Sequence, residues 1–187
     1  AAGSAAGGVA EAAALRERGN AAMQAGDLLG ARSLYTEALA CGDGALPDDE
    51  RAKIFGNRCA VLLLLRQEEG GDGVGVAEAA LSDAEAAAEL TPTAGKAHYR
   101  LGCAREAAGD LTGASEALRV AAALMPPEQR VGVLAKRKGV EARQAELVER
   151  VGKAKASAMA AEALAAEGAR ARARAAARGG RDPTAAT

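Results

Sequence analysis

Five polar side chains, three cationic and two carboxamide, recur at helical spacing in this sequence of 187 residues. Arg16 and Asn20 are four residues apart, as are Lys96 and Arg100, so each pair shares one helix face. Asn57 lies between the two pairs. Arg offers a planar fork of donors, Lys a point charge, and Asn both donors and an acceptor. If the three segments meet, this set of side chains can bind the carboxylates of a ligand.

The segments that carry these residues follow a recurring spacing pattern. Residues at offsets of 12, 4 and 3 are Gly19, Ala31, Tyr35 and Ala38, and again Gly102, Ala114, Leu118 and Ala121. Offsets of 4, 3 and 5 connect Ala80, Ala84, Ala87 and Pro92, and again Ala114, Leu118, Ala121 and Pro126. Small residues at fixed offsets allow two helices to approach closely, and a fixed period indicates stacked helix pairs.

The composition predicts an all-α protein. Alanine dominates and aromatic residues make up only 2% of the chain, which favours helices over strands. Breakers and start signals delimit helices over about 9–25, 28–41, 48–67, 76–90, 94–108, 111–124 and 128–178. Residues 1–8 and 179–187 are predicted to be flexible or frayed, and the glycine-rich run 70–75 is predicted to be an inter-helix loop.

At these residues the chain resembles the tetratricopeptide repeat family. The first unit reads LRERGNAAMQAGDLLGARSLYTEALA (15–40), and the third reads KAHYRLGCAREAAGDLTGASEALRVAAALMP (96–126). The second unit combines FGNRCAVLLLLR (55–66) with AEAALSDAEAAAELTP (77–92). The resemblance implies three helix-turn-helix repeats in a right-handed superhelix, with a long C-terminal capping helix. The implied division is a flexible N-terminus (1–8), a repeat domain (9–126), a capping helix (127–152) and an Ala/Arg-rich helical extension (153–187).

The five polar residues resemble the dicarboxylate clamp of co-chaperone members of this family. In that family the clamp holds the carboxylates of the EEVD tail of heat-shock chaperones of the 70 and 90 classes. Asn20, Asn57, Lys96 and Arg100 match the family pattern, whereas Arg16 stands where the family usually has Lys. The resemblance implies a protein-interaction adaptor whose partner is the C-terminal peptide of heat-shock protein 70 or 90. Unpaired cysteines and the absence of an export signal favour a cytoplasmic location.

No pattern in the sequence indicates catalysis, a metal or a cofactor. Cys41, Cys59 and Cys103 are widely spaced, which argues against a disulfide framework and against zinc. His98 is the only histidine and has no nucleophile at a recognisable spacing, so we interpret it as a surface or groove residue. No apolar run reaches membrane-spanning length. The body is acidic, which argues against nucleic-acid binding, while the segment from Lys136 onward is basic.

Two other interpretations compete with the adaptor. In the first, the chain is a structural subunit of a larger, for example ciliary, assembly. The helix after residue 153 has little apolar surface and would gain order from a partner. In the second, the repeats are the binding half of an enzyme, although nothing in 127–187 resembles a catalytic module. The sequence does not identify the preferred chaperone class, the client or the oligomeric state.

Overall fold

The computed structural model describes residues 2–41, 46–68 and 74–179, and these residues form helices without a strand. The helices are α1 (Ala2–Gln24), α2 (Leu28–Cys41), α3 (Asp48–Glu68), α4 (Val74–Leu90), α5 (Gly95–Ala107), α6 (Leu111–Leu124) and α7 (Pro127–Gly179). The predicted all-α class is confirmed. Most of the predicted loop 70–75 and nearly all of the predicted frayed end fall outside the described residues. The chain divides into a repeat body (1–143) and a C-terminal unit (144–187).

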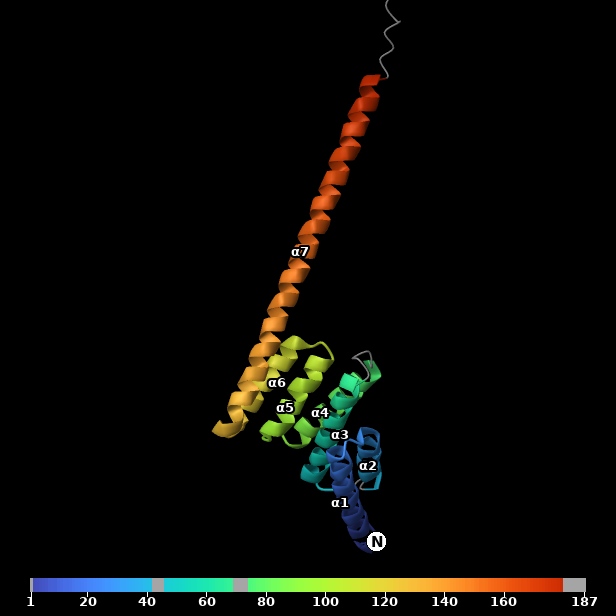
Figure 1. Cartoon of the computed structure of the whole chain (residues 1–187), viewed down its shortest axis with the longest axis vertical. Helices are drawn as coiled ribbons and strands as arrows, with labels where there is room; N and C mark the ends of the chain where they lie inside the picture. The colour runs from blue at the N-terminus through green and yellow to red at the C-terminus, as the bar shows by residue number, and fades with distance from the viewer. Residues whose placement is uncertain (1, 42–45, 69–73, 180–187) are drawn as a thin grey trace, which may run out of the picture. The chain divides into compact units, whose positions relative to one another are not determined.

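The repeat body is a stack of three antiparallel helix pairs (Figure 1). Within the pairs, α1 packs on α2, α3 on α4, and α5 on α6. Helix α3 also contacts α1 on one side and α5 on the other, so the first helices of the pairs form one continuous layer. Side chains that project from this layer can therefore meet, although they are far apart in the sequence.

The first and third pairs are joined by the same turn. Gly26 and Gly109 have φ of +83° and +87°, a backbone conformation that favours glycine. The aspartate that follows each glycine then caps the second helix. Asp110 Oδ1 accepts a hydrogen bond of 2.8 Å from Gly113 N, and Asp27 Oδ1 accepts one of the same length from Gly30 N. These Gly-Asp turns are thus sharp reversals between paired helices.

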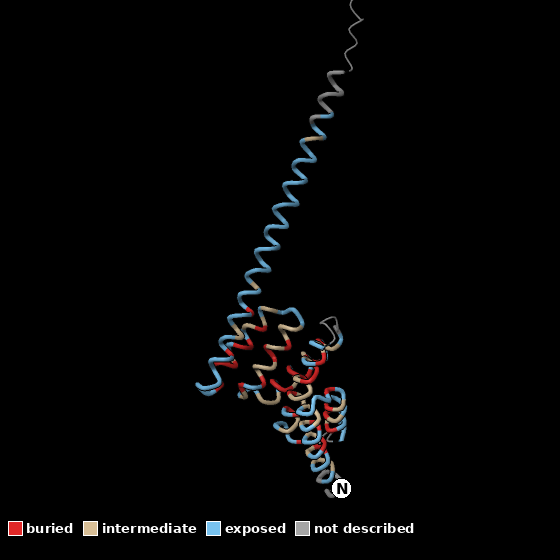
Figure 2. Tube along the Cα trace, in the orientation of Figure 1, coloured by how far each residue is buried: buried red, intermediate tan, exposed pale blue. Residues whose placement is uncertain are grey.

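The spacing pattern marks the places where the paired helices approach most closely. A Cβ atom on Gly19 would lie 2.6 Å from Tyr35 Cε1, and one on Gly102 would lie 2.6 Å from Leu118 Cγ. Each of these glycines therefore accommodates a large side chain from the second helix of its pair. The alanines of the pattern are fully buried between the helices, as Figure 2 shows for the core. Burial of these small residues sets the close spacing of the helices.

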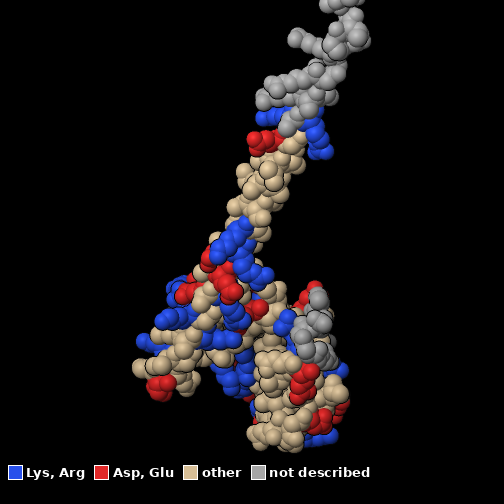
Figure 3. All heavy atoms as spheres, turned by 45° about the horizontal axis from the view of Figure 1, so that its top comes forward, with Lys and Arg blue, Asp and Glu red and all other residues tan. Residues whose placement is uncertain are grey.

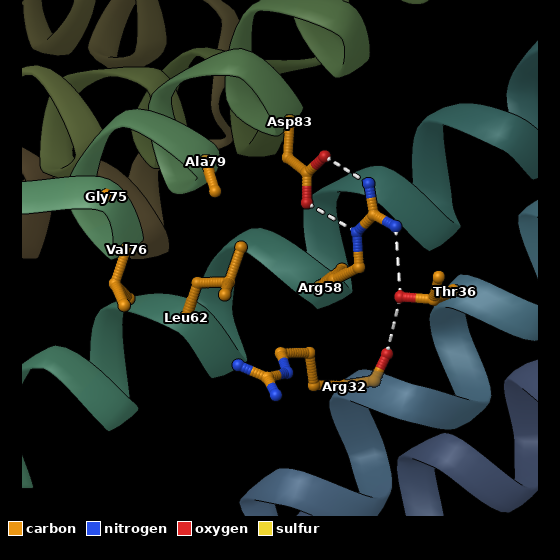
Figure 4. Close-up of a pocket in the computed structure, with 8 residues that line it drawn as sticks. All are labelled: Arg32, Thr36, Arg58, Leu62, Gly75, Val76, Ala79 and Asp83. Carbon is orange, nitrogen blue, oxygen red and sulfur yellow. Dashed lines mark hydrogen bonds and ion pairs between the residues drawn. The ribbon is translucent and has the colours of Figure 1, made fainter.

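An ion pair within the second repeat, together with one hydrogen bond to α2, connects the first two repeats (Figure 4). Arg58 on α3 donates from Nε and Nη2 to Asp83 on α4, at 2.8 and 2.7 Å. Its Nη1 donates to Thr36 Oγ1 on α2 at 3.1 Å. Asp83 is only 3% exposed and Arg58 satisfies both of its oxygens, so removal of either partner would leave a buried charge. The guanidinium thus fixes α2, α3 and α4 relative to one another.

The first part of α7 covers the third repeat. Val133 and Val140 are buried in a cluster with the alanines of α6, and Lys136 Nζ lies 2.6 Å from Glu106 Oε2 on α5. After Val140, no valine or leucine in the described part of α7 is buried. In the C-terminal unit, Leu147, Val148, Val151, Met159 and Leu164 are exposed. The middle of this unit is almost free of charged side chains (Figure 3).

Helix α1 begins at Ala2, so the segment predicted to be flexible is described as helical in residues 2–8. Alanine has the highest helix propensity, and its abundance there offsets the cost of Gly7 and Gly8. Gly8 also has a packing role, since a Cβ atom on it would lie 3.0 Å from the Cys41 carbonyl oxygen. Within the described residues, no helix has both the length and the apolar character needed to cross a membrane.

Candidate carboxylate-binding site

Three of the five predicted residues form a hydrogen-bonded chain across the first helices of the repeats. Asn57 Nδ2 on α3 donates to Asn20 Oδ1 on α1 at 2.9 Å. Arg100 Nη2 on α5 donates to Asn57 Oδ1 at 3.0 Å. Residues separated by 37 and 43 positions in the sequence are thus connected side chain to side chain. We refer to the five predicted residues together as the carboxylate site.

Tyr35 anchors one end of this chain, from below the layer of first helices. Its ring is completely buried against Gly19, and its hydroxyl donates to Asn20 Oδ1 at 2.8 Å. Burial raises the pKa of this phenol, while a hydrogen bond with Asn57 and the nearby charges of Arg100 and Arg16 act in the opposite direction. Because Asn20 Oδ1 accepts from both Tyr35 and Asn57, the orientation of the Asn20 amide is defined.

Arg100 lies in a space that a glycine leaves open. A Cβ atom on Gly56 would lie 2.8 Å from Arg100 Nη1, so the guanidinium extends directly across the α3 backbone. Burial lowers the pKa of Arg100, which indicates that this cation is poorly solvated. Among the residues that the structure describes, no carboxylate pairs with it. A partly buried cation without a counter-ion favours the binding of an anionic ligand.

Lys96 adds a second cation one turn earlier on α5. The charge of Arg100 is the main reason that the pKa of Lys96 is lowered, and partial burial contributes further. Lys96 and Arg100 both line a pocket of about 200 Å³ whose walls include Ala52, Ala87 and Ala97. The two cations repel one another across this pocket, and a bound anion would relieve that repulsion.

Arg16 is in a different situation from the cations of α5. Its Nη2 lies 2.8 Å from Glu17 Oε1, and its Nε lies 3.3 Å from Glu50 Oε2. No contact joins it directly to the other four residues of the site, although its charge influences Tyr35. The structure therefore connects Asn20, Asn57 and Arg100 and places Lys96 beside Arg100, while Arg16 is paired with acidic residues of the chain itself.

Sequence reasoning missed two contributions to the site. Tyr35 belongs to the spacing pattern and packs against Gly19, but its hydroxyl also orients Asn20. Gly56 was not singled out, although it directly precedes Asn57, just as Gly19 precedes Asn20. The recurrence of a Gly-Asn pair in the first two repeats was the signal that could have revealed it.

In the described part of the repeat body, His98 and Cys59 are both constrained by the fold. His98 Nε2 is 2.8 Å from the Pro92 carbonyl oxygen, which engages that ring nitrogen. Burial raises the pKa of the Cys59 thiol to about 12, so it is protonated at neutral pH. Within the described residues, no three His, Cys, Asp or Glu side chains are grouped so that they could hold a metal ion. The arrangement is suited to binding an anion.

Comparisons with known proteins place this geometry in a family. No family model matches the sequence, and no curated protein matches it either. Among solved structures, the Sgt2 TPR domain from Aspergillus fumigatus is 31% identical over 72% of this chain and 82% of its own, with a TM-score of 0.54. The second TPR domain of human RPAP3, in complex with the HSP70 peptide SGPTIEEVD, is 26% identical over 68% and 95%, with a TM-score of 0.55.

A further structure agrees with these two in fold. The first TPR of Spaghetti (RPAP3), bound to the HSP90 peptide SRMEEVD, has a TM-score of 0.60 at 23% identity, over 73% of this chain and 98% of its own. The matches span nearly the whole length of these small domains, and their length corresponds to that of the repeat body. The chain belongs to the tetratricopeptide repeat family.

Proposed function

We propose that this protein is a non-catalytic adaptor whose carboxylate site captures the acidic C-terminal tail of a chaperone of the heat-shock protein 70 or 90 class. The observation that carries this proposal is the hydrogen-bonded chain from Tyr35 through Asn20 and Asn57 to Arg100. It holds two carboxamides and a cation in fixed orientations on three different helices. Such preorganisation reduces the entropy lost when a ligand binds.

The charges of the site favour a doubly negative peptide end. Lys96 and Arg100 are cations without a carboxylate partner in the described part of the chain, and Asn20 and Asn57 provide neutral amides. A main-chain carboxylate and an aspartate side chain would together neutralise the two cations. Each charge-assisted hydrogen bond contributes roughly 1.5–3 kcal/mol, and ordering a short peptide opposes binding. A micromolar dissociation constant, about −8 kcal/mol, is the expected balance.

The comparison with human RPAP3 supports the identity of the ligand. Its second TPR domain is 26% identical to this chain, and its solved complex contains an HSP70 peptide that ends in EEVD. We extend that ligand class to this chain because the residues that match the family's clamp lie on neighbouring helices here. The three cysteines are free thiols, in keeping with the cytosol as the compartment that we propose.

Calorimetric titration of a peptide ending in EEVD tests the proposal. We expect micromolar binding that weakens as salt is raised from about 0.05 to 0.5 M, since ions screen the attraction. A parallel titration with tails of the two chaperone classes would establish which is preferred. Binding that does not respond to salt, or no binding at millimolar peptide, would refute the proposal.

A second function is favoured by the exposed apolar residues of the C-terminal unit. Leu147, Val148 and Val151 lie within one helical turn of each other and are all exposed. In this alternative the protein is a structural subunit held in a larger assembly through α7. Stable co-purification of other subunits that survives Lys96→Ala would favour it, whereas recovery of chaperones that is lost with Lys96→Ala favours the adaptor.

A further inference from the structure

The first turn of α3 brings acidic side chains of the chain itself to the carboxylate site. Asp48, Asp49 and Glu50 occupy that turn, where negative charge is favoured by the helix dipole. Of the three, only Glu50 reaches the α1 end of the site, with its Oε2 3.3 Å from Arg16 Nε. The protein's own Glu50 carboxylate thus pairs with Arg16, one of the cations that the sequence pattern predicts to bind the ligand.

The pairing of Arg16 with Glu50 is incomplete. Arg16 Nε is buried and has no hydrogen-bond partner in the described residues, because the 3.3 Å approach of Glu50 is not aligned as a hydrogen bond. Glu50 is also shared, since its Oε1 lies 2.6 Å from Lys53 Nζ. Both side chains keep some exposure, 20% for Arg16 and 25% for Glu50. A ligand can therefore replace Glu50 at Arg16, and Lys53 remains to hold the displaced carboxylate.

We propose that Glu50 is a specificity-determining residue of the carboxylate site, an internal competitor that occupies Arg16 until a ligand carboxylate displaces it. This inference rests on the proposed function. Since Glu50 is negative, it also repels an arriving anion. Only a ligand that also binds Lys96 and Arg100 compensates for this repulsion. The site therefore discriminates against peptide ends with a single carboxylate, which cannot engage both ends of the site.

The test compares two variants that remove one negative charge from the same helical turn. Glu50→Gln removes the carboxylate near Arg16 Nε while Glu17 stays 2.8 Å from Nη2, and Asp48→Asn is its matched control. Asp48 is 71% exposed, and among the described residues its ion pair is with Arg51, at 3.8 Å. Both changes alter the net charge and the helix dipole equally. We expect Glu50→Gln to tighten binding of the EEVD peptide about three- to tenfold, and Asp48→Asn to change it less than about twofold.

A double-mutant cycle establishes that the effect passes through Arg16. In the background Arg16→Gln, we expect Glu50→Gln to tighten binding by less than about twofold, because no cation remains to be released. Thermal unfolding of each variant separates a binding effect from loss of fold. An EEVD peptide with an amidated C-terminus, whose last residue keeps only its side-chain carboxylate, should gain more from Glu50→Gln than the free acid does.

Each outcome bears on a different statement. If the parent binds the peptide and Glu50→Gln binds no more tightly than Asp48→Asn, Glu50 is not a competitor and the proposed function stands. Weaker binding by Glu50→Gln would also overturn the inference, since Glu50 would then position Arg16 for the ligand. If Glu50→Gln binds the peptide and the parent does not, the inference is supported. If neither protein binds, the proposed function fails and the inference fails with it.

Discussion

Both ends of the carboxylate site contain cations, but within the described ranges of the chain those at one end lack a carboxylate partner and the one at the other end is paired. At the α5 end, Arg100 and Lys96 have no carboxylate partner in the described structure, and the pKa of each is lowered. At the α1 end, Arg16 is paired with Glu17 and Glu50. A cation that is already paired gains little from a new anion, because it must give up one partner for another. The ligand should therefore obtain most of its binding energy from α5.

Replacement of Arg100 should have the largest effect on binding. Arg100→Ala removes the partly buried cation and leaves Asn57 Oδ1 without its donor. We expect affinity for the EEVD peptide to fall at least about 30-fold, or roughly 2 kcal/mol. Calorimetry measures the change, and Arg119→Ala is the control, because Arg119 is an exposed arginine paired only with Glu116. Equal losses in the two variants would contradict the role assigned to α5.

Lys96→Ala should have the second-largest effect. We expect affinity for the EEVD peptide to fall about tenfold, less than for Arg100→Ala, because Lys96 is more exposed than Arg100. The control is Lys138→Ala, at an exposed position of α7.

Affinity should also depend on pH. The pKa of Lys96 in the free protein is lowered from its ordinary 10.5, and a bound anion raises it. Affinity therefore has its full value at neutral pH and falls at alkaline pH, where Lys96 loses its proton, whereas Lys96→Arg should abolish this alkaline loss.

Gly56→Ala should weaken binding by about fivefold without unfolding the protein. The added Cβ would meet the flexible end of Arg100, so the guanidinium moves while α3 keeps its conformation. Alanine should instead raise the melting temperature, since it is favoured over glycine inside a helix by up to about 1 kcal/mol. Gly139→Ala, where a Cβ meets nothing within 4 Å, should give the stability gain with no loss of binding. A Gly56→Ala variant that binds as the parent does would show that the position of Arg100 is not critical.

The smallest effect is expected at the α1 end. Arg16→Gln should reduce peptide affinity by less than about threefold, because Glu17 and Glu50 already neutralise this cation. Fluorescence anisotropy with a labelled peptide has the precision to measure it. A loss equal to that of Arg100→Ala would remove the distinction between the two ends.

Much of the fold could be predicted because packing and turn signals agree in this sequence. The buried alanines and the Gly-Asp turns fix helix pairs locally, and α2 and α6 have the predicted bounds. The start of α1 could not be predicted, since the packing of Gly8 against Cys41 depends on tertiary structure.

The composition of the site could be predicted better than its interactions. Asn20 and Asn57 each follow a packing glycine, and Arg100 lies two residues before Gly102, so helical register alone places them in one layer. The pairing of Arg16 with Glu50 joins two residues of different repeats. It depends on how the first turn of α3 packs against α1, and no local pattern encodes that packing.

The most direct test of the central claim combines two changes, one in the peptide and one in the protein. The EEVD peptide is titrated as free acid and as C-terminal amide into the parent and into Arg100→Ala. If Arg100 contacts the terminal carboxylate, amidation should weaken binding to the parent about tenfold or more and should have almost no effect on Arg100→Ala. An amide that binds the parent as tightly as the acid would contradict the account, as would an equal loss in both proteins.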